Sequence, residues 1–278
     1  MAVLLTLAAA AATVAVLMTG TAVLARRTDR LAVVDVTWGV GFVVVAAVMI
    51  VVGASLADDT STWRSALLLA LVAVWGGRLA WHVRSRAHGL LGPGEKPPED
   101  PRYAELMEGR PFSYAVTRVF LTQGVAMFLV STPVAVAMAL PVAGGAEGGW
   151  GWWVVGLGVV VWLVGIVFEA VGDAQLAAYK AIPKPERPLV MDRGLWAWTR
   201  HPNYFGDACV WWGLWLVGGL ASGWVVGLAT LVAPVAMTCF LLFATGARLL
   251  EREMMRRPGY PAYAARTSMF VPRPPRRA

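Results

Sequence analysis

The stretch that decides the fold is Gly194–Trp215, GLWAWTRHPNYFGDACVWWGLW, where a polar, aromatic cluster runs directly into an apolar helix. Pro202 suits the first turn of a helix, where its missing N–H is not needed. A helix that begins there presents free backbone N–H groups and its positive dipole end beside Arg200, which predicts an anion site such as one for a phosphate. Asn203 and Asp207 are four residues apart and share a helical face. The alternative is that Arg200 and His201 are interfacial anchors.

The composition places this stretch at the edge of a membrane. The 278 residues are 58% hydrophobic and 15% charged, with 14 Trp and a mean hydropathy of +0.61. Because charged residues make up about a quarter of a soluble domain, an all-α integral membrane protein with one membrane domain is expected. The net charge of +7 does not indicate a nucleic-acid partner, since the basic residues cluster at the ends of apolar segments.

Seven apolar segments are predicted to cross the bilayer, which requires about 20 residues each. They are 2–25, 32–56, 63–82, 114–140, 150–178, 204–220 and a segment from 224 that continues into a basic amphipathic helix at 248–257. Pro234 should kink the last one. The Pro-rich segment 84–110 is expected to be a surface loop with a short helix near 103–108, and 179–199 a second polar loop.

The loop charges predict the orientation. Nearly all Lys and Arg residues lie in every second loop and in the C-terminal tail, while the alternate loops hold Asp58, Asp59, Glu147 and one cation, Arg64. The positive-inside rule then puts the N-terminus outside and the C-terminus in the cytoplasm. The membrane is expected to be the inner (plasma) membrane of the cell.

The ionisable residues at membrane depth all lie at the predicted cytoplasmic ends of their helices. They are Asp35, Arg78, His82, Glu169, Asp173, Asp207, Arg248 and Glu251. Because lone charges facing lipid are costly, a single cytoplasm-facing cavity is expected. Internal pairs such as Arg78 with Asp35 are the alternative for individual members. No GxSxG, HExxH, Walker or GxGxxG pattern is present, and the three His and two Cys lack metal-ligand spacing, so no metal is expected.

Several motifs together resemble a known family. DxQxxxxK at 173–180, GLWxxTRHPNYFGD at 194–207, LLE at 249–251 and RPGYPAY…TSMFVPRPP at 257–275 resemble the C-terminal half of the steroid 5-alpha-reductase superfamily. DVTWGVGF at 35–42, WGGRLAWHVRSR at 75–86 and EDPRY at 99–103 resemble its bacterial membrane branch. The resemblance implies a seven-helix reductase that uses NADPH to saturate a carbon–carbon double bond conjugated to a ketone in a steroid-like or other lipid.

The resemblance also implies roles for single residues. Residues 150–278 would form the cofactor-binding half, with Asn203, Asp207, Asp173 and Glu169 holding the nucleotide. Lys180, Arg200 and Arg266 would meet its phosphates, and Tyr204, Tyr260 and Tyr263 would stack or hydrogen-bond. His201 and Glu251 belong to the same expected site.

Residues 1–141 would form the substrate side, where the sequence departs from the steroid reductases. Those enzymes use a Glu and a Tyr to polarise the ketone, and no such pair is evident here. His82 is the leading candidate for the catalytic donor, with Asp35 orienting it or pairing with Arg78. Trp38, Trp81, Tyr103 and Tyr114 are expected to line the substrate site.

Two other functions compete with the reductase. The shorter pattern RHPNY…E…Y is also similar to membrane methyltransferases of the isoprenylcysteine and phospholipid type, which bind S-adenosylmethionine. A transporter or non-enzymatic membrane protein is the other alternative, although no internal repeat is visible. The sequence leaves the oligomeric state open.

Overall fold

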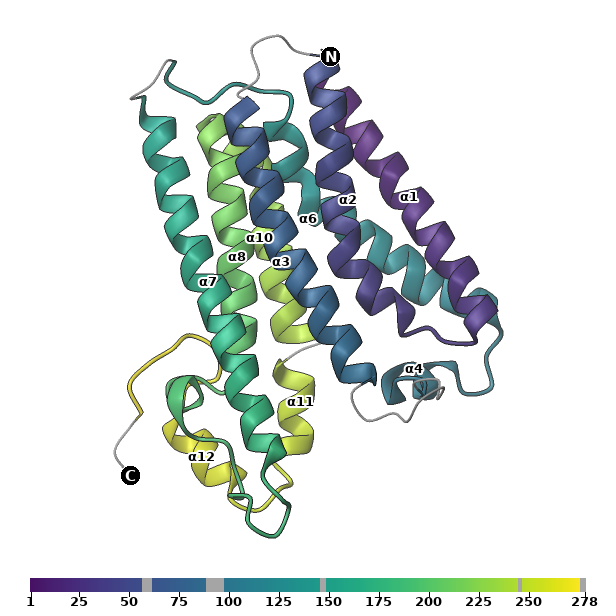
Figure 1. Cartoon of the computed structure of the whole chain (residues 1–278), viewed down its shortest axis with the longest axis vertical. Coiled ribbons are helices and arrows are strands. Elements are labelled where there is room, and N and C mark those ends of the chain that lie inside the picture. The colour runs from purple at the N-terminus through teal and green to yellow at the C-terminus, as the bar shows by residue number, and fades with distance from the viewer. Residues whose placement is uncertain (57–61, 89–97, 146–148, 245–246, 276–278) are drawn as a thin grey trace. The chain divides into compact units, whose positions relative to one another are not determined.

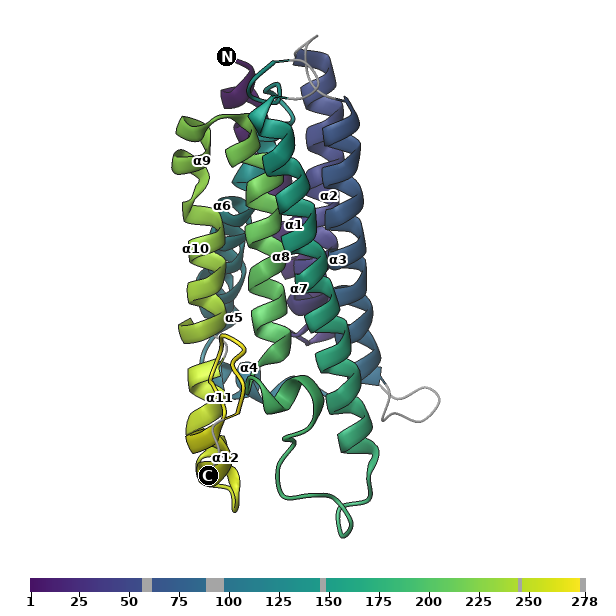
Figure 2. The ribbon, with the colours of Figure 1, turned by 90° about the vertical axis from the view of Figure 1, so that its left-hand side faces the viewer.

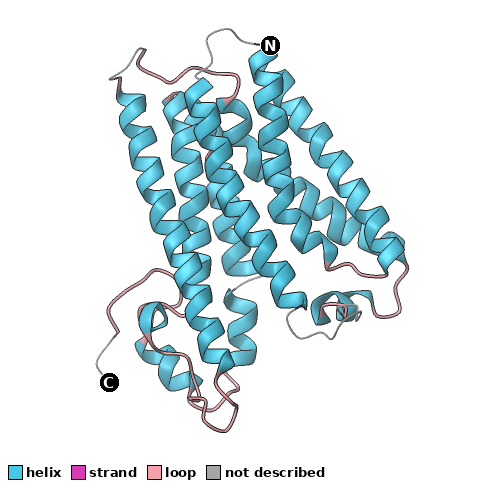
Figure 3. Ribbon diagram, viewed as in Figure 1, coloured by secondary structure: helices cyan, strands magenta, loops and turns pink. Residues whose placement is uncertain are grey.

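The structure is a computed structural model that describes residues 1–56, 62–88, 98–145, 149–244 and 247–275. The described residues form helices joined by loops, and extended backbone pairs among them at a single bridge between Thr199 and Ser268 (Figure 3). Asp58, Asp59 and Glu147, which carry part of the predicted orientation, lie outside the described residues.

The helices follow the predicted apolar segments (Figure 1). They are α1 (Ala2–Thr28), α2 (Val33–Leu56), α3 (Thr62–His88), α4 (Pro101–Met107), α5 (Phe112–Ala115), the π-helix η1 (Val116–Leu121), α6 (Thr122–Ala137), α7 (Trp150–Ala181), η2 (Gly194–Ala197), α8 (Pro202–Gly218), η3 (Leu220–Ser222), α9 (Trp224–Thr230), α10 (Val232–Cys239), the π-helix η4 (Phe240–Ala244), α11 (Ala247–Met254) and α12 (Tyr260–Arg266).

Six helical segments of the described chain are long and apolar enough to cross a membrane, which confirms a multi-pass helical membrane protein. They are 2–28, 33–56, 62–86, 112–137, 150–181 and 224–243. The remaining predicted span corresponds to α8, which has 17 residues. The short helix predicted in the first polar loop is confirmed as α4.

The predicted kink at Pro234 is confirmed as a break in the helix. α9 ends at Thr230 and α10 begins at Val232, so the break precedes Pro234 by one turn. A proline ring clashes with the carbonyl four residues earlier, which here belongs to Thr230.

The chain divides into two compact units, and the first contains residues 1–154 and 217–233. In it α1 packs on α2 and α6, and α2 packs on α3. A Cβ atom on Gly39 of α2 would lie 2.5 Å from the carbonyl oxygen of Gly76 of α3, so the two backbones touch at these glycines. Trp75 and Phe42 pack against each other beside this crossing and are buried.

Arg64 departs from its predicted place among the loop charges, because it is buried in the first turns of α3 with 0% of its surface exposed. Its guanidinium donates to the carbonyl oxygens of Ala137 (2.8 Å) and Leu140 (2.5 Å) and to Ser222 Oγ (3.0 Å). It therefore satisfies carbonyls that the end of α6 leaves without helical partners.

The second unit contains residues 155–216 and 234–278, and α7 and α8 lie side by side in it (Figures 1 and 2). Glycines allow this close approach. A Cβ atom on Gly206 would lie 2.5 Å from the carbonyl oxygen of Gly165, and one on Gly213 would lie 2.7 Å from that of Gly158. About two turns of α7 further on, Gly172 lies against Pro202. This contact places the polar end of α7 beside the start of α8.

Candidate functional site

Polar side chains gather in one cluster in each unit. In the second unit, Glu251 of α11 is the centre of what we call the Glu251 cluster, with Arg200, His201 and Tyr260. Arg200 binds both carboxylate oxygens, from Nε to Oε1 at 2.5 Å and from Nη2 to Oε2 at 2.8 Å. Nε2 of His201 lies 3.2 Å from Oε1, and the Tyr260 hydroxyl donates to the same oxygen at 3.3 Å. The cluster joins the residues before α8 to α11 and α12.

Arg200 also holds the backbone near the end of α12. Its Nη1 donates to the carbonyl oxygens of Ala264 and Thr267. A guanidinium has five N–H donors, and four hydrogen bonds to the protein occupy most of them. Arg200 therefore acts as an internal tie in this structure, and its predicted contact with a phosphate stays a prediction.

The electrostatics of the Glu251 cluster follow from these contacts. Burial alone would raise the pKa of Glu251, but the hydrogen bonds and charges of His201 and Arg200 outweigh it and lower the pKa to about 2. Burial and the Glu251 charge raise the pKa of Tyr260, and burial and Tyr260 raise that of Tyr263. At neutral pH the cluster thus holds an ionised carboxylate between a guanidinium and protonated phenols.

The C-terminal tail fastens the segment that leads into α8. Thr199 Oγ1 donates to the carbonyl oxygen of Phe270 at 2.8 Å, and Arg200 N donates to that of Ser268 at 2.9 Å. Arg273 N donates to the carbonyl oxygen of Trp198 at 3.0 Å. Tyr263, predicted as a cofactor contact, donates its hydroxyl to the carbonyl oxygen of Trp196 at 2.5 Å. The RHPN motif is therefore fixed by residues about 70 positions further along the chain.

Asp173 and Asn203 are brought together as the sequence analysis expected for one cofactor site. Nδ2 of Asn203 donates to Oδ1 of Asp173 at 3.2 Å, between the end of α7 and the first turn of α8. Glu169 lies one turn earlier on α7 and is buried, with 4% of its surface exposed. Gln175 accepts a bond from Leu195 N at 3.0 Å, so the loop returns directly onto α7.

The other predicted cofactor residues occupy different surroundings. Lys180 is exposed at the end of α7, and Asp207 is half-buried on α8. Tyr204 stacks on His201 with ring centroids 5.4 Å apart. Arg266 pairs with Asp192 of the polar loop. The structure thus joins Arg200, His201, Glu251 and Tyr260 in one cluster and Asp173 with Asn203 in a separate pair.

In the first unit, Asp35 of α2 is the centre of the Asp35 cluster, with Arg102, Tyr103 and Gln123. The Tyr103 hydroxyl donates to Oδ1 of Asp35 at 2.6 Å, and Arg102 Nη2 donates to Oδ2 at 2.9 Å. Gln123 Nε2 donates to the Tyr103 hydroxyl oxygen at 3.3 Å. Burial and the charge of Asp35 raise the pKa of Tyr103, so its phenol keeps its proton.

The expected pairing of Asp35 with His82 or Arg78 is not present, because the bonds of this carboxylate within the described residues go to Arg102 and Tyr103. His82 lies half-buried in α3. Asp100, the N-cap of α4, holds Arg102 in place. The backbone N and the Nε of Arg102 each donate to Oδ1 of Asp100 at 2.9 Å. Sequence reasoning missed Arg102, although the Asp-Pro sequence at 100–101 is a recognisable helix start.

The four residues predicted to line the substrate site lie in different surroundings. Tyr103 is buried in the Asp35 cluster. The ring of Trp38 lies edge-on to that of Phe42, with the ring centroids 5.2 Å apart. Trp81 is 72% exposed. The guanidinium of Arg110 lies over the ring of Tyr114, 4.3 Å from the ring centroid. Of these four, only Tyr103 forms a hydrogen bond with Asp35 among the described residues.

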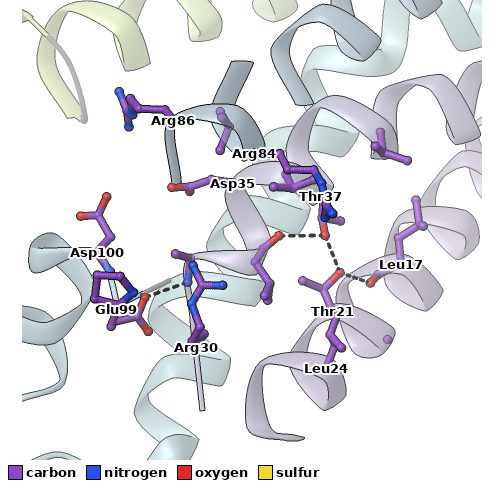
Figure 4. A pocket seen from close by; sticks show the side chains of 18 of the residues that line it. Leu17, Thr21, Leu24, Arg30, Asp35, Thr37, Arg84, Arg86, Glu99 and Asp100 are labelled. Carbon is purple, nitrogen blue, oxygen red and sulfur yellow. Dashed lines mark hydrogen bonds between the residues drawn. The ribbon is translucent and has the colours of Figure 1, made fainter. Parts of the chain in front are cut away.

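Beside Asp35 lies a pocket of about 840 Å³ between α1, α2, the end of α3 and residues 98–101 (Figure 4). Its walls are apolar along α1 and α2, and charged side chains gather at one end. Glu99 fixes that end because its carboxylate accepts the backbone N–H groups of Leu31 and Ala32, just before α2 begins. A carboxylate is favourable at the positive end of a helix dipole.

Comparison with known proteins accounts for most of the chain. The uncharacterized protein C594.04c of Schizosaccharomyces pombe is 23% identical over 236 residues, which cover 76% of this chain and 64% of that protein. No solved structure matches the chain. Residues 22–267 match the family described as protein of unknown function, DUF1295, and this range includes both the Asp35 cluster and the Glu251 cluster. The chain belongs to the DUF1295 family.

Proposed function

We propose that the protein is a membrane-embedded, NADPH-dependent reductase that saturates a carbon–carbon double bond conjugated to a ketone in a lipid. The contact that carries the proposal is the Tyr103 hydroxyl bonded to Asp35 beside an apolar-walled pocket. It pairs a carboxylate with a phenol, as the steroid 5-alpha-reductases that the sequence resembles pair a Glu with a Tyr. The motif resemblance between residues 173 and 275 supports the choice of cofactor.

The first unit would supply the proton donor. Reduction at the β-carbon of an enone builds negative charge on the carbonyl oxygen, which a hydrogen-bond donor must stabilise. The phenol of Tyr103 is protonated at neutral pH and held by Asp35, and it would turn its proton toward the substrate oxygen. Arg102 would hold the Asp35 carboxylate in place. His82 is the competing donor.

The second unit would hold the cofactor. NADPH would supply the hydride when bound. The paired carboxylate and amide of Asp173 and Asn203 suit the ribose hydroxyls and the nicotinamide amide. The exposed Lys180 suits a phosphate, while Arg200 and Glu251 would position the segment that leads into α8.

The proposed topology has seven spans, with α8 as the sixth of them along the chain. Its 17 residues reach the lower limit for a transmembrane helix. An odd number of spans puts the two termini on opposite sides of the inner membrane, and the loop charges put the N-terminus outside and the basic C-terminus in the cytoplasm. The substrate would then enter from the bilayer and the cofactor from the cytoplasm.

The test compares ligands on the purified full-length chain. A ligand at 100 times its dissociation constant stabilises by about 2.7 kcal/mol, so NADPH should raise the unfolding temperature. NADH and S-adenosylmethionine are tested in the same way for comparison. Oxidation of NADPH is then followed with a panel of lipid enones.

We expect stabilisation by NADPH and enone-dependent oxidation. Stabilisation by S-adenosylmethionine alone would replace the reductase with a membrane methyltransferase of the isoprenylcysteine or phospholipid type. Stabilisation by none of the three ligands would favour the transporter or non-enzymatic alternative.

A further inference from the structure

The pocket beside Asp35 has apolar residues of two helices along its walls, and we refer to it as the groove. Its apolar wall runs along α1 from Val16 to Leu24 and along α2 from Val33 to Gly41. Nine residues of helix span about 12 Å at 1.5 Å per residue. Thr21 and Thr37 join the two helices across the groove with a hydroxyl-to-hydroxyl bond of 3.1 Å (Figure 4). The groove is therefore bounded by two neighbouring helices along its whole apolar length.

The charged end of the groove contains three carboxylates whose hydrogen bonds the protein itself supplies. Asp35 accepts from Tyr103 and Arg102, and Asp100 accepts from Arg102. Glu99 accepts from backbone N–H groups at 31, 32 and 100. The bond from Arg102 also lowers the pKa of Asp100. Each of the three carboxylates at this end thus receives its hydrogen bonds from the protein itself.

Cations also line this end of the groove, and one of them has a nitrogen that lacks a hydrogen-bond acceptor among the described residues. Arg30 lines the groove, and its Nε is buried without a hydrogen-bond partner among the described residues. The turn after α1 fixes its backbone, because Asp29 adopts a left-handed conformation (φ 53°) and Arg30 N donates to the carbonyl oxygen of Ala25 at 3.0 Å. Arg86, at the end of α3, also lines the groove and is exposed. A buried charged donor without an acceptor is costly, so a ligand acceptor at Arg30 would relieve that cost.

We propose that this groove binds a single-chain acidic lipid, with its anionic phosphate or carboxylate head at Arg30 and Arg86 and its chain between α1 and α2. The proposal deepens the reductase proposal, because it gives the substrate of the same pocket an acidic head. It rests on the proposed function only in treating the bound lipid as a substrate. Binding is measured without NADPH, so either proposal can fail while the other stands.

The experiment titrates the full-length protein with two probes in a non-ionic detergent, using native mass spectrometry. Oleoyl lysophosphatidate and oleoyl lysophosphatidylcholine share one chain and differ in the net charge of the head. We expect the acidic lipid to bind about tenfold more tightly, and Arg30→Gln to remove about that factor. Arg27→Gln removes the same charge from an exposed site three residues earlier and should change affinity by less than about twofold.

A second pair of variants tests the apolar part of the groove. Gly20 lines the groove, and a Cβ atom there would meet nothing within 4 Å, so Gly20→Phe fills the space without a clash at Cβ. It should abolish binding of both lipids. Gly156→Phe is the control, because Gly156 also has open space and lies on α7. Equal affinity for the two lipids, an equal loss in Arg27→Gln, or full binding by Gly20→Phe would each overturn the proposal.

Discussion

Glu251 shows how one side chain can organise a segment of the second unit. Its carboxylate receives Arg200 on both oxygens, together with His201 and Tyr260, so α11 is tied to the residues before α8 and to α12. Charge-assisted bidentate contacts of this kind are among the strongest hydrogen bonds in proteins. Removing the charge should therefore affect folding before it affects chemistry.

We expect Glu251→Gln to lower stability at neutral pH and to change its dependence on acid. The folded-state pKa of about 2 lies below the ordinary value of 4.5, so the charge stabilises the fold above about pH 4.5. That contribution disappears as the pH falls from about 4.5 to about 2. The difference in unfolding temperature between wild type and variant should thus be large at pH 7 and shrink at pH 3.

Glu253→Gln is the matched control for this measurement. Glu253 lies on the same helix, and its pair with Arg256 is exposed. Exposed pairs contribute little, so this variant should resemble wild type at both pH values. A constant difference for Glu251→Gln from pH 7 to pH 3 would contradict the assigned role.

Tyr103→Phe tests the proposed donor by removing one oxygen atom. If the hydroxyl donates to the substrate, turnover should fall by about 10² to 10⁴-fold while stabilisation by NADPH is retained. Enone-dependent NADPH oxidation measures the first quantity, and thermal unfolding with and without NADPH measures the second. His82→Ala is assayed alongside. Full turnover in Tyr103→Phe with loss in His82→Ala would assign the donor to His82, as the sequence analysis first predicted.

At the scale of helices, the crossing of α7 and α8 depends on glycines spaced seven residues apart. Gly158, Gly165 and Gly172 on α7 lie against Gly213, Gly206 and Pro202 on α8. Small residues let membrane helices approach closely, where packing rather than the hydrophobic effect drives association. The same crossing sets the Asp173–Asn203 pair, because both residues lie next to the Gly172–Pro202 contact.

We expect Gly206→Ala to destabilise the protein by about 1–3 kcal/mol through overpacking. Its Cβ would lie 2.5 Å from a carbonyl oxygen and 2.6 Å from the backbone N of Glu169, and neither backbone atom can move aside cheaply. At an open helical position the same change should stabilise by about 0.8–1.0 kcal/mol. Gly156→Ala, with no neighbour within 4 Å, is that control, so unfolding temperatures should shift in opposite directions. Shifts of the same sign would argue against close packing here.

Pro133 lies inside α6 without leaving the backbone unsatisfied. Pro133 cannot donate to the carbonyl oxygen of Leu129, and the Thr132 hydroxyl donates to it instead at 2.8 Å. In hydrocarbon, freed backbone groups must be satisfied within the protein, which explains why a hydroxyl side chain accompanies this proline.

At the scale of the whole molecule, the charge pattern predicts the orientation of the chain. Single cysteines at Glu147 and Arg273, in a background without Cys209 and Cys239, should react with an impermeant thiol reagent from opposite sides of the membrane. Arg273 should be reached from the cytoplasm. Labelling of both positions from one side would exclude an odd number of spans.

The sequence by itself determined the helical membrane class, six of the spans and the break at Pro234. These features depend on local composition, because a run of about 20 apolar residues partitions into the bilayer and must satisfy its backbone as a helix. The proline break is equally local, since ring and carbonyl are four residues apart. The family resemblance of the motifs implied a common site for Asp173 and Asn203, and the structure joins the two by a hydrogen bond.

Tertiary structure alone decided which charges meet. Arg64 reaches the end of α6, 73 residues away, and Asp35 meets Tyr103 rather than His82 or Arg78. Arg200 binds Glu251, 51 residues further on, where the sequence suggested a phosphate contact. Periodicity shows which residues share a helical face, but the partner of a long polar side chain depends on which helix packs there and in what register. That choice is set by close contacts such as Gly39 with Gly76 and Gly165 with Gly206, which local sequence does not specify.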